Sequence, residues 1–359
     1  MAATDFPLGH ALAVQRWSLS LAIEAEVYQY FRKFMGTGDN NIIKIKTELN
    51  KQAGEKIIVG FRQKLAGDGT EGDNVIEGTS AEEALEFFSD SLFIDQRRKG
   101  TKSKGKMSEQ RVPYNMRLQG RNALSVWYGE DYDQQLFYYL SGMRGITAGH
   151  VSTGWTGRAN NSLQTPDSAH LVYGGNATSA ATIDANDTMD LDLIERLVAK
   201  AETVDPMLQP VVMKGGENKF VLLMHNFQAY DLRKAVSTND WVDIRKNTDG
   251  MDSLLYQNAL GDYAGVILHK HRNVVRFDST VGSYAVDGAR ALFLGGQAGM
   301  IAWGGGGTYG RYSWNEEKDD RGNALAITAG AIYGCKKTRF NSKDFGVFSV
   351  DTACTDLNA

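Results

Sequence analysis

Histidine is the residue type best suited to acid-base or metal chemistry, and this sequence contains six of them. His269 and His271 flank Lys270 in a segment that reads as a strand, where alternate residues share one face. Two imidazoles on one face are potential zinc ligands when a carboxylate converges on them. No carboxylate has the spacing to do so, and the pattern therefore favours two surface or interface histidines over a metal site.

Other chemical motifs are equally weak. Residues 305–310 spell GxGxxG, but a dinucleotide-binding fold needs this motif to open a helix, and the following segment is polar and turn-like. Cys335 and Cys354 lack the spacing of a metal or redox motif and read as two reduced structural thiols. The carboxylates that remain as candidate acid-base groups, without any supporting spacing, are Asp205, Asp231, Glu316 and Glu317. The sequence therefore predicts no catalytic, metal or cofactor-binding site, and a protein that is not an enzyme.

The bulk charge of the chain argues against several functions. With 39 basic and 43 acidic residues the net charge is −4, which gives no general attraction to nucleic acid. Between Arg290 and Arg311 lie 20 uncharged residues, the length of a membrane span, but eight of them are glycine and disfavour a helix. The N-terminus has no secretory signal pattern. We therefore expect no membrane contact, and only local, non-specific contact with DNA.

Two adjacent blocks of opposite charge are the most informative local feature. The acidic block, between residues 65 and 96, contains nine acidic residues and no basic one: Asp68, Glu71, Asp73, Glu77, Glu82, Glu83, Glu86, Asp90 and Asp95. The basic block follows it: Arg97, Arg98, Lys99, Lys102, Lys104 and Lys106. One interpretation is two solvated loops. The other is an extended arm that lies across the complementary surface of an identical neighbour in a head-to-tail contact.

The elements that position these blocks follow from periodicity and caps. The first half of the chain predicts a helix over 11–34, a strand over 55–66, a helix over 84–90 after capping boxes at Thr79 and Ser80, and a strand over 91–97. Residues 114–142 are most simply one long helix, and an interruption near Gly129 is the alternative. Residues 145–187 read as irregular chain, a length that is usually functional or spread over the surface.

The second half predicts shorter elements. They are a helix over 190–203 with Thr188 as its N-cap, a buried strand over 219–227, helices over 228–236 and 252–260, and one strand or a strand pair over 263–277. Helices and strands alternate without a repeating βαβ rhythm.

Five segments in fixed order resemble the major capsid proteins of tailed phages, in the branch typified by the N-four-like phages. The segments are VIEGTSAEEALEFFSDSLFIDQRRKG, FYYLSGMRG, KFVLLMHNFQAYDLRK, GDYAGVILHKHRNVV and ARALFLGGQA. The resemblance covers about residues 15 to 350, and it rests on the ordered set because no single segment is diagnostic. It implies an α+β Hong Kong 97-like capsid fold. The expected parts are an N-terminal arm (1–50), an E-loop (51–107), a peripheral domain with a spine helix (108–205 and 330–359) and an inserted axial domain (206–329).

The resemblance also implies a function. The chain is expected to assemble with itself into pentamers and hexamers of an icosahedral virion shell that encloses double-stranded DNA, in the host cytoplasm. Further expected partners are a portal protein, a separate scaffold and a decoration or cement protein. We expect no covalent cross-link and no cleaved N-terminal scaffolding segment. The alternatives are an encapsulin-like compartment shell, which shares the fold, and a monomeric binding module that uses residues 145–187.

Two groups of residues are candidates for contacts between subunits. The first comes from the charged blocks: Asp68, Glu71, Asp73, Glu82, Glu83, Arg97, Arg98, Lys99 and Lys102. The second is expected around the capsomer axis: Trp303, Gly304, Gly305, Gly306 and Gly307. Because exposed charges contribute little to monomer stability, reversal of Arg97, Arg98 and Lys99 is expected to impair assembly but not folding.

Overall fold

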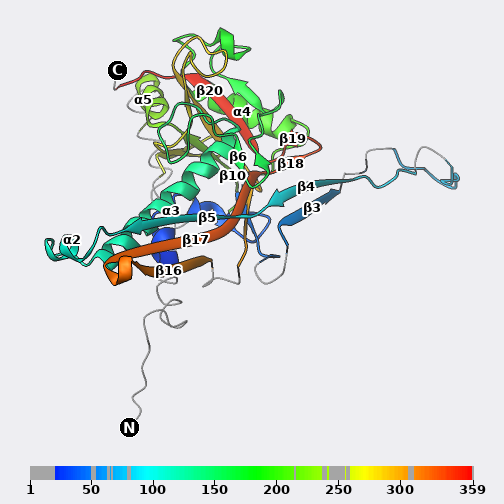
Figure 1. The fold of residues 1–359 in the computed structure, drawn as a ribbon. Coiled ribbons are helices and arrows are strands. Elements are labelled where there is room, and N and C mark those ends of the chain that lie inside the picture. Colours follow the sequence, from blue (N-terminus) through cyan, green and yellow to red (C-terminus); the bar gives the residue numbers. More distant parts are fainter. Residues whose placement is uncertain are drawn as a thin grey trace.

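Two β-sheets, a long helix and a projecting hairpin make up the architecture of this computed structural model (Figure 1). The structure describes residues 21–357 except 50–53, 63–64, 66–67, 79–81, 214–215, 237–240, 242–254, 256–258 and 306–310. The predicted helices over 11–34 and 252–260 fall partly or mostly outside this range. Within it, residues 21–27 are helical and lead into a short 3₁₀ turn, η1 (Phe31–Phe34).

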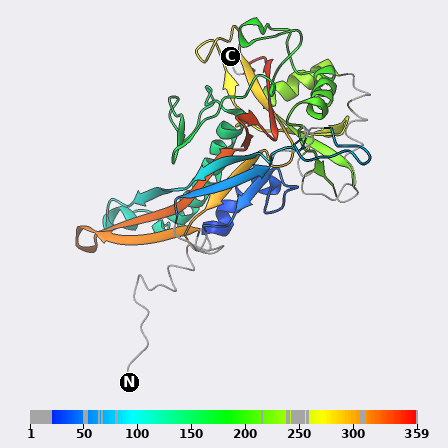
Figure 2. The ribbon, with the colours of Figure 1, turned by 90° about the vertical axis from the view of Figure 1, so that its right-hand side faces the viewer.

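A six-stranded sheet forms the elongated part of the molecule. Its strands are β1 (Met35–Gly36), β2 (Ile43–Lys46), β5 (Asp95–Lys102), β15 (Gly299–Trp303), β16 (Tyr312–Asp319) and β17 (Ala324–Lys337). The long strand β17 pairs antiparallel with β15, β16 and β5. Figure 2 shows these strands side by side, reaching away from the rest of the molecule. The sheet therefore carries the basic block, since β5 contains Arg97 to Lys102.

The long helix α3 (Met116–Ser141) packs along this sheet. Its buried stripe repeats every four residues, as helix geometry requires: Leu124, Tyr128, Tyr132, Leu136 and Leu140. The Asn115 side chain caps its first turn by accepting from the backbone N–H groups of Arg117 and Leu118, and Gly142 ends it in the left-handed conformation. The long helix is confirmed. The helix is continuous through Gly129, so the alternative of an interruption there is wrong.

An eight-stranded sheet forms the second part of the molecule. Its strands are β8 (Leu171–Tyr173), β9 (Val211–Val212), β10 (Asn218–Met224), β11 (Gly261–Tyr263), β12 (Val266–Lys270), β13 (Arg276–Phe277), β14 (Gly288–Leu294) and β20 (Val347–Ala353). The helix α4 (Leu191–Thr203) contributes Leu193, Ile194 and Leu197 to a shared core with this sheet. A further helix is α5 (Asn226–Ala235). The cap of α4 is the Asp190 side chain, not the predicted Thr188.

The remaining elements connect these layers. They are β6 (Gly157–Arg158), β7 (Asn161–Ser162), β18 (Arg339–Phe340), β19 (Lys343–Asp344), α2 (Lys106–Gln110), η2 (Ala180–Thr182) and η4 (Asp320–Gly322). Residues 145–187 contain only short elements, as predicted. The structure also shows that no helix among the described residues is long and apolar enough to cross a membrane. The glycine-rich apolar segment instead supplies two buried strands, β14 and β15, one to each sheet.

The projecting arm is an antiparallel hairpin of β3 (Lys56–Arg62) and β4 (Phe87–Phe93). The strand over 55–66 is confirmed. The predicted helix over 84–90 is wrong, because Phe87 to Phe93 pair with β3. Capping boxes encode only a local preference, and here cross-strand pairing overrides it.

Sheet membership crosses the predicted domain ranges in two places. Strand β20, from the range predicted as peripheral, pairs with β14 in the eight-stranded sheet. Strands β15 and β16, from the range predicted as axial, pair with β17 in the elongated sheet. Strands of one hydrogen-bonded sheet form one packed layer, so the ranges 206–329 and 330–359 do not follow the layers of the structure.

Candidate subunit interface

Most of the acidic block lies on the outer part of the arm, between β3 and β4, whereas Asp90 lies on β4 and Asp95 on β5. The predicted acidic contact residues are all exposed there: Asp68, Glu71, Asp73, Glu82 and Glu83. Some of the polar groups in this segment stabilise its own shape. The carboxylate of Glu82 accepts from the backbone N–H of Gly78 at 3.0 Å, and the Asn74 amide donates to the carbonyl of Glu71 at 2.7 Å. The side chains nevertheless present a concentration of negative charge to solvent.

Arg97 makes its main contact within its own subunit. Its guanidinium Nη2 lies 2.5 Å from Oδ1 of Asp131, whose side chain is only 1% exposed on α3. The other carboxylate oxygen, Oδ2, accepts from the amide of Gln135 at 2.7 Å and from the Tyr333 hydroxyl at 3.0 Å. Arg97 therefore neutralises a buried carboxylate that joins α3, β5 and β17, and reversing its charge would disturb folding.

The neighbouring basic residues are placed differently. Arg98 and Lys99 are exposed on β5, and because a strand alternates they lie on opposite faces. The ammonium of Lys99 lies 5.5 Å from the centre of the Trp127 ring, on the side of α3. Lys102 is exposed and pairs with Asp319 of β16 at 2.5 Å. Arg98 and Lys99 thus remain the strongest basic candidates for contact with another subunit.

The two charged surfaces lie at opposite sides of the molecule. In Figure 1 the arm projects to the right, whereas β5 runs to the left from the point where it follows β4. The acidic residues at the tip of the arm therefore do not meet Arg98 and Lys99 within one chain. Opposite charges on separate parts of one subunit are the arrangement that a head-to-tail contact between copies requires.

The arm also exposes large apolar side chains. Val75 is 72% exposed and Phe87 is 69% exposed, and they are accompanied by Ile58, Leu65, Ile76 and Leu85. Scattered apolar residues are ordinary on a protein surface, but this group is concentrated on a single thin hairpin. The arm therefore has apolar surface that a second molecule can bury.

The residues predicted to surround the capsomer axis are only partly described. Trp303 is 5% exposed and packs against Tyr132 and Tyr333 in the main core. This burial is incompatible with a direct contact between subunits, so the assignment of Trp303 is corrected. Gly304 is also buried, and its N–H donates to the carbonyl of Ile332 at 2.9 Å. Gly305 is exposed, whereas Gly306 and Gly307 lie outside the described residues.

The histidine pair has a packing role. His269 is fully buried, contrary to the expectation of a surface or interface residue, and its Nε2 lies 2.7 Å from the carbonyl oxygen of Leu255. The His271 ring stacks on Phe137 with centres 5.0 Å apart, and burial lowers the pKa of His271 to about 4. Both rings contact Tyr30 of the N-terminal segment. Across the described residues, no group of three or more potential ligands could hold a metal ion.

The N-terminal segment is attached to α3 through a second buried carboxylate. Asp133 accepts from the backbone N–H groups of Tyr30 at 2.6 Å and Phe31 at 3.1 Å. Burial raises the pKa of Asp133 to about 7, opposed by these two hydrogen bonds. Gly129 allows the close approach of this segment, because a Cβ there would lie 2.6 Å from Cβ of Tyr28. The segment is thus fixed on the same helix that supports β5.

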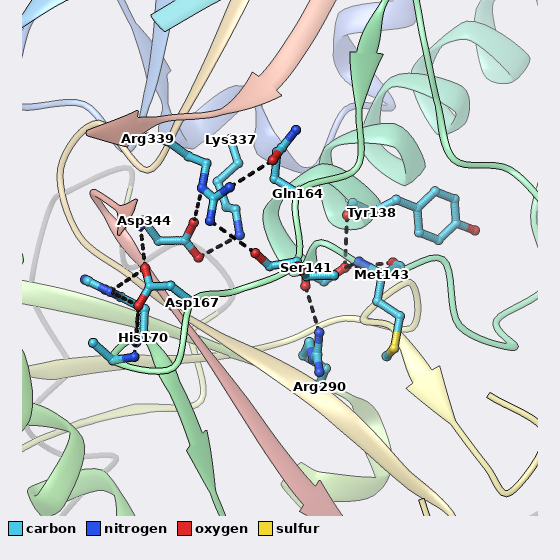
Figure 3. Close-up of polar contacts among 12 residues, drawn as sticks. Tyr138, Ser141, Met143, Gln164, Asp167, His170, Arg290, Lys337, Arg339 and Asp344 are labelled. Atoms are coloured by element: carbon cyan, nitrogen blue, oxygen red, sulfur yellow. Dashed lines mark hydrogen bonds and ion pairs between the residues drawn. The ribbon is translucent and has the colours of Figure 1, made fainter. Parts of the chain in front are cut away.

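A cluster of buried charges connects the two sheets (Figure 3). Lys337, at the end of β17, lies 2.6 Å from Asp344, whose other oxygen accepts from Arg339 at 3.1 Å. Arg290 of β14 binds Asp351 of β20 with two hydrogen bonds of 2.6 and 2.7 Å.

The same cluster reaches α3 and the segment before β8. Arg290 donates to the carbonyl of Ser141, the last residue of α3, at 3.0 Å. The backbone N–H of Asp344 donates to Asp167 at 2.7 Å, and Asp167 also contacts the His170 ring at 3.0 Å. Burial lowers the pKa of Lys337 to about 8, against the attraction of Asp344. These contacts fix the eight-stranded sheet relative to the elongated one.

Sequence reasoning missed Asp131, Asp133 and the residues at the junction of the sheets. For the two aspartates the sequence holds little signal, because both lie in the polar run EDYDQQ over 130–135, where charged residues are normally exposed. For Lys337, Asp344 and Arg290 the partners come from distant segments, and no local pattern indicates them.

The two sheets, the long helix and the projecting hairpin define an α+β protein of the capsid type, and comparisons with known proteins bear this out. A family model described as phage capsid protein matches residues 5–356. A major capsid protein of Pseudomonas phage KPP25 is 28% identical over 364 residues, which is 94% of each chain. The capsid of Ralstonia phage GP4 contains a chain that is 38% identical, covers 100% of both chains and gives a TM-score of 0.84.

A more distant solved structure shares the fold. The capsid of cyanophage Pam1 contains a chain that is 20% identical over 90% of this chain and 92% of that one, with a TM-score of 0.72. The chain described here belongs to the phage capsid protein family and has the Hong Kong 97-like capsid fold. The resemblance noted in the sequence is confirmed, and an encapsulin-like compartment shell is not favoured.

Proposed function

We propose that this capsid protein forms pentamers and hexamers of an icosahedral shell around double-stranded DNA, and that the acidic arm of each subunit lies on strand β5 of the next. The observation that carries this proposal is that the arm, whose outer part contains Asp68, Glu71 and Asp73, and strand β5, which contains Arg98 and Lys99, extend in opposite directions (Figure 1). The acidic arm and the basic strand β5 can therefore pair only between two copies of the chain. Repetition of this contact can close a ring.

The two layers have separate roles in this proposal. The elongated sheet with α3 corresponds to the peripheral domain, and the eight-stranded sheet with α4 and α5 to the axial domain. The fold contributes structure and contacts, not catalysis. Assembly takes place in the host cytoplasm with a portal, a separate scaffold and a decoration protein, and the mildly acidic chain contacts DNA only non-specifically.

A reciprocal charge reversal tests the contact. One variant carries Asp68, Glu71 and Asp73 changed to Lys, a second carries Arg98 and Lys99 changed to Glu, and a third combines both sets. Each of the first two variants is expected to reduce the yield of closed shells in electron micrographs at least tenfold, because like charges then face each other. The third variant is expected to restore the yield of closed shells, because opposite charges again face each other. A control changes the exposed Arg233 and Lys234 of α5 to Glu.

Salt dependence gives an independent check. Assembly of the wild-type chain is expected to weaken between low and moderate salt, because exposed charges are screened over about 10 Å at 0.1 M ionic strength. Single reversals that assemble as well as the wild type, or a combination no better than either single set, would show that the charged blocks are only solvated surface.

A further inference from the structure

The arm leaves the body of the subunit beside a short hairpin, β6 and β7, which we call the 157–162 hairpin. It pairs Gly157 with Ser162 and Arg158 with Asn161. Ala159 and Asn160 form its tip with φ values of 54° and 58°, the conformation of a type I′ turn. No helix or strand was predicted here, since the hairpin lies within the long stretch predicted to be irregular. Its side chains contact the arm on one side and the core on the other.

The contact with the arm is made by Asn161. This residue is 2% exposed, and its side-chain amide donates to the carbonyl of Phe93 at 2.8 Å. In return the backbone N–H of Phe93 donates to the amide oxygen of Asn161 at 3.0 Å. One side chain thus satisfies both backbone groups of Phe93, the last residue of β4, as a neighbouring strand would. Phe93 is the point at which the arm ends and the chain passes into β5.

The contact with the body is made by Arg158 and by the backbone of the hairpin. The guanidinium of Arg158 donates to the carbonyl of Tyr333 on β17 at 2.7 Å and to that of Asp95 on β5 at 3.1 Å. Its centre also lies 4.0 Å from the centre of the Tyr333 ring. The Tyr139 hydroxyl of α3 donates to the carbonyl of Asn161 at 3.0 Å and accepts from the N–H of Arg158 at 2.9 Å. The hairpin is therefore fixed to α3, β17 and β5 together.

The packing around Phe93 leaves little room for another arm angle. A Cβ on Gly334 of β17 would lie 1.9 Å from the carbonyl oxygen of Phe93, so this part of the arm rests directly on the β17 backbone. A second attachment lies three residues earlier, where Asp90 pairs with Lys336 and accepts from the N–H of Arg339 at 3.2 Å. The direction of the arm is set where it joins the body.

Small changes at this point are amplified at the tip. The seven residues of β3 span about 20 Å at ~3.3 Å per residue, so a tilt of about 10° at Phe93 moves the far end of the strand by about 3–4 Å. That displacement is enough to bring a charge pair within reach or to break it, because ion pairs are formed within about 4 Å.

We propose that Asn161 and Arg158 are positioning residues: through Phe93 and Asp95 they hold the arm at the angle at which it meets a second copy of this chain. The inference rests on the proposed shell function and adds the residues that determine its geometry. Neither residue touches the neighbouring subunit in this account. They act through the arm, and their loss alters the curvature of the assembly before it alters the stability of the subunit.

The test uses full-length chains carrying Asn161→Ala and Arg158→Lys, with Ser162→Ala as a matched control. Ser162 is exposed on the same hairpin, and its hydroxyl contacts only Gln164 among the hydrogen bonds of the described residues. Two readouts are needed: amide hydrogen exchange of subunits, and the diameter distribution of particles in electron micrographs. We expect exchange in β3 and β4 to rise at least tenfold in Asn161→Ala while α3 and β10 stay protected. The particles are expected to be open or of several diameters.

The results separate this inference from the proposed function. If the wild-type chain forms no closed shells, the proposed function fails and this inference fails with it. If the wild type forms shells and Asn161→Ala forms the same shells in the same yield, only the inference is overturned. Unchanged exchange in β3 and β4 also overturns it. Unfolding of both Asn161→Ala and Arg158→Lys overturns it as well, because the hairpin would then be part of the core and not a positioning element.

Discussion

Adjacent residues of one basic block have opposite roles. The sequence predicts a strand only as far as Arg97, and it treats Arg97, Arg98 and Lys99 as equivalent because composition does not reveal which way a side chain points. The partner of Arg97 is Asp131, whose burial on α3 depends on a helix packing against β17. Whether a basic residue pairs with a buried carboxylate or faces solvent depends on tertiary packing, and the pattern of charges in the sequence does not reveal it.

Arg97→Ala and Arg98→Ala distinguish the two roles. Removing Arg97 leaves the carboxylate of Asp131 buried without its cation, which is expected to lower the free energy of unfolding by about 3–5 kcal/mol. Removing the exposed Arg98 is expected to change it by less than about 0.5 kcal/mol. Urea unfolding of the two variants measures both values. Equal stabilities would show that Asp131 does not depend on Arg97.

The buried Asp133 predicts a pH dependence of stability. Its pKa is raised to about 7 in the folded chain, so this group contributes stability that is fully present below its unfolded pKa of about 3.9 and is lost as pH rises through about 7. The unfolding free energy of the wild type relative to Asp133→Asn is therefore expected to fall by about 2–3 kcal/mol from pH 5 to pH 8. Thermal unfolding of both chains across this range measures the difference. A difference that is flat or rises with pH would contradict it.

At the scale of elements, local patterns predicted α3 and the strand over 55–66 correctly, and they failed for the helix over 84–90. The stripe from Leu124 to Leu140 identifies α3 because its period is intrinsic to a helix. Residues 84–90 carry helix-favouring caps, yet Phe87 onward forms β4 because β3 lies beside it. Asn161 acts on the backbone of Phe93 at a distance of 68 residues in sequence, which no local pattern contains. Elements defined by their own period were predictable, and elements defined by a distant partner were not.

Gly129 affects the packing of two elements, because it lets the N-terminal segment approach α3 closely without interrupting the helix. Gly129→Ala improves the intrinsic helix propensity of α3 by about 1 kcal/mol, but its Cβ would lie 2.6 Å from Cβ of Tyr28 and 2.9 Å from the carbonyl oxygen of Ala25. We expect a net loss of about 1–3 kcal/mol and faster hydrogen exchange in residues 21–36. Asn122→Ala, at an exposed position of the same helix, is the control. Greater stability of Gly129→Ala would mean that the N-terminal segment packs elsewhere.

At the scale of the whole molecule, the ordered resemblance correctly predicted the capsid fold and family, whereas the domain ranges did not follow the sheets. Strand β20 returns to the eight-stranded sheet because β14 provides seven paired positions for it. The pairing of β20 with β14 depends on the topology of the sheet, which amino-acid composition does not indicate. The separation of charge between the arm and β5 also exists only at this scale, since acidic residues 68–86 and the basic residues of β5 are close in the sequence, but the arm and β5 extend in opposite directions (Figure 1).

A cryo-electron microscopy reconstruction of particles assembled from the wild-type chain tests this separation most directly. The account predicts closed shells in which the arm of each subunit lies on β5 of the next, with acidic residues among 68–83 within ion-pair distance of Arg98 or Lys99. Dispersed monomers would contradict the shell function. Closed shells in which the acidic tip faces solvent or a different surface would contradict the head-to-tail contact between the arm and β5.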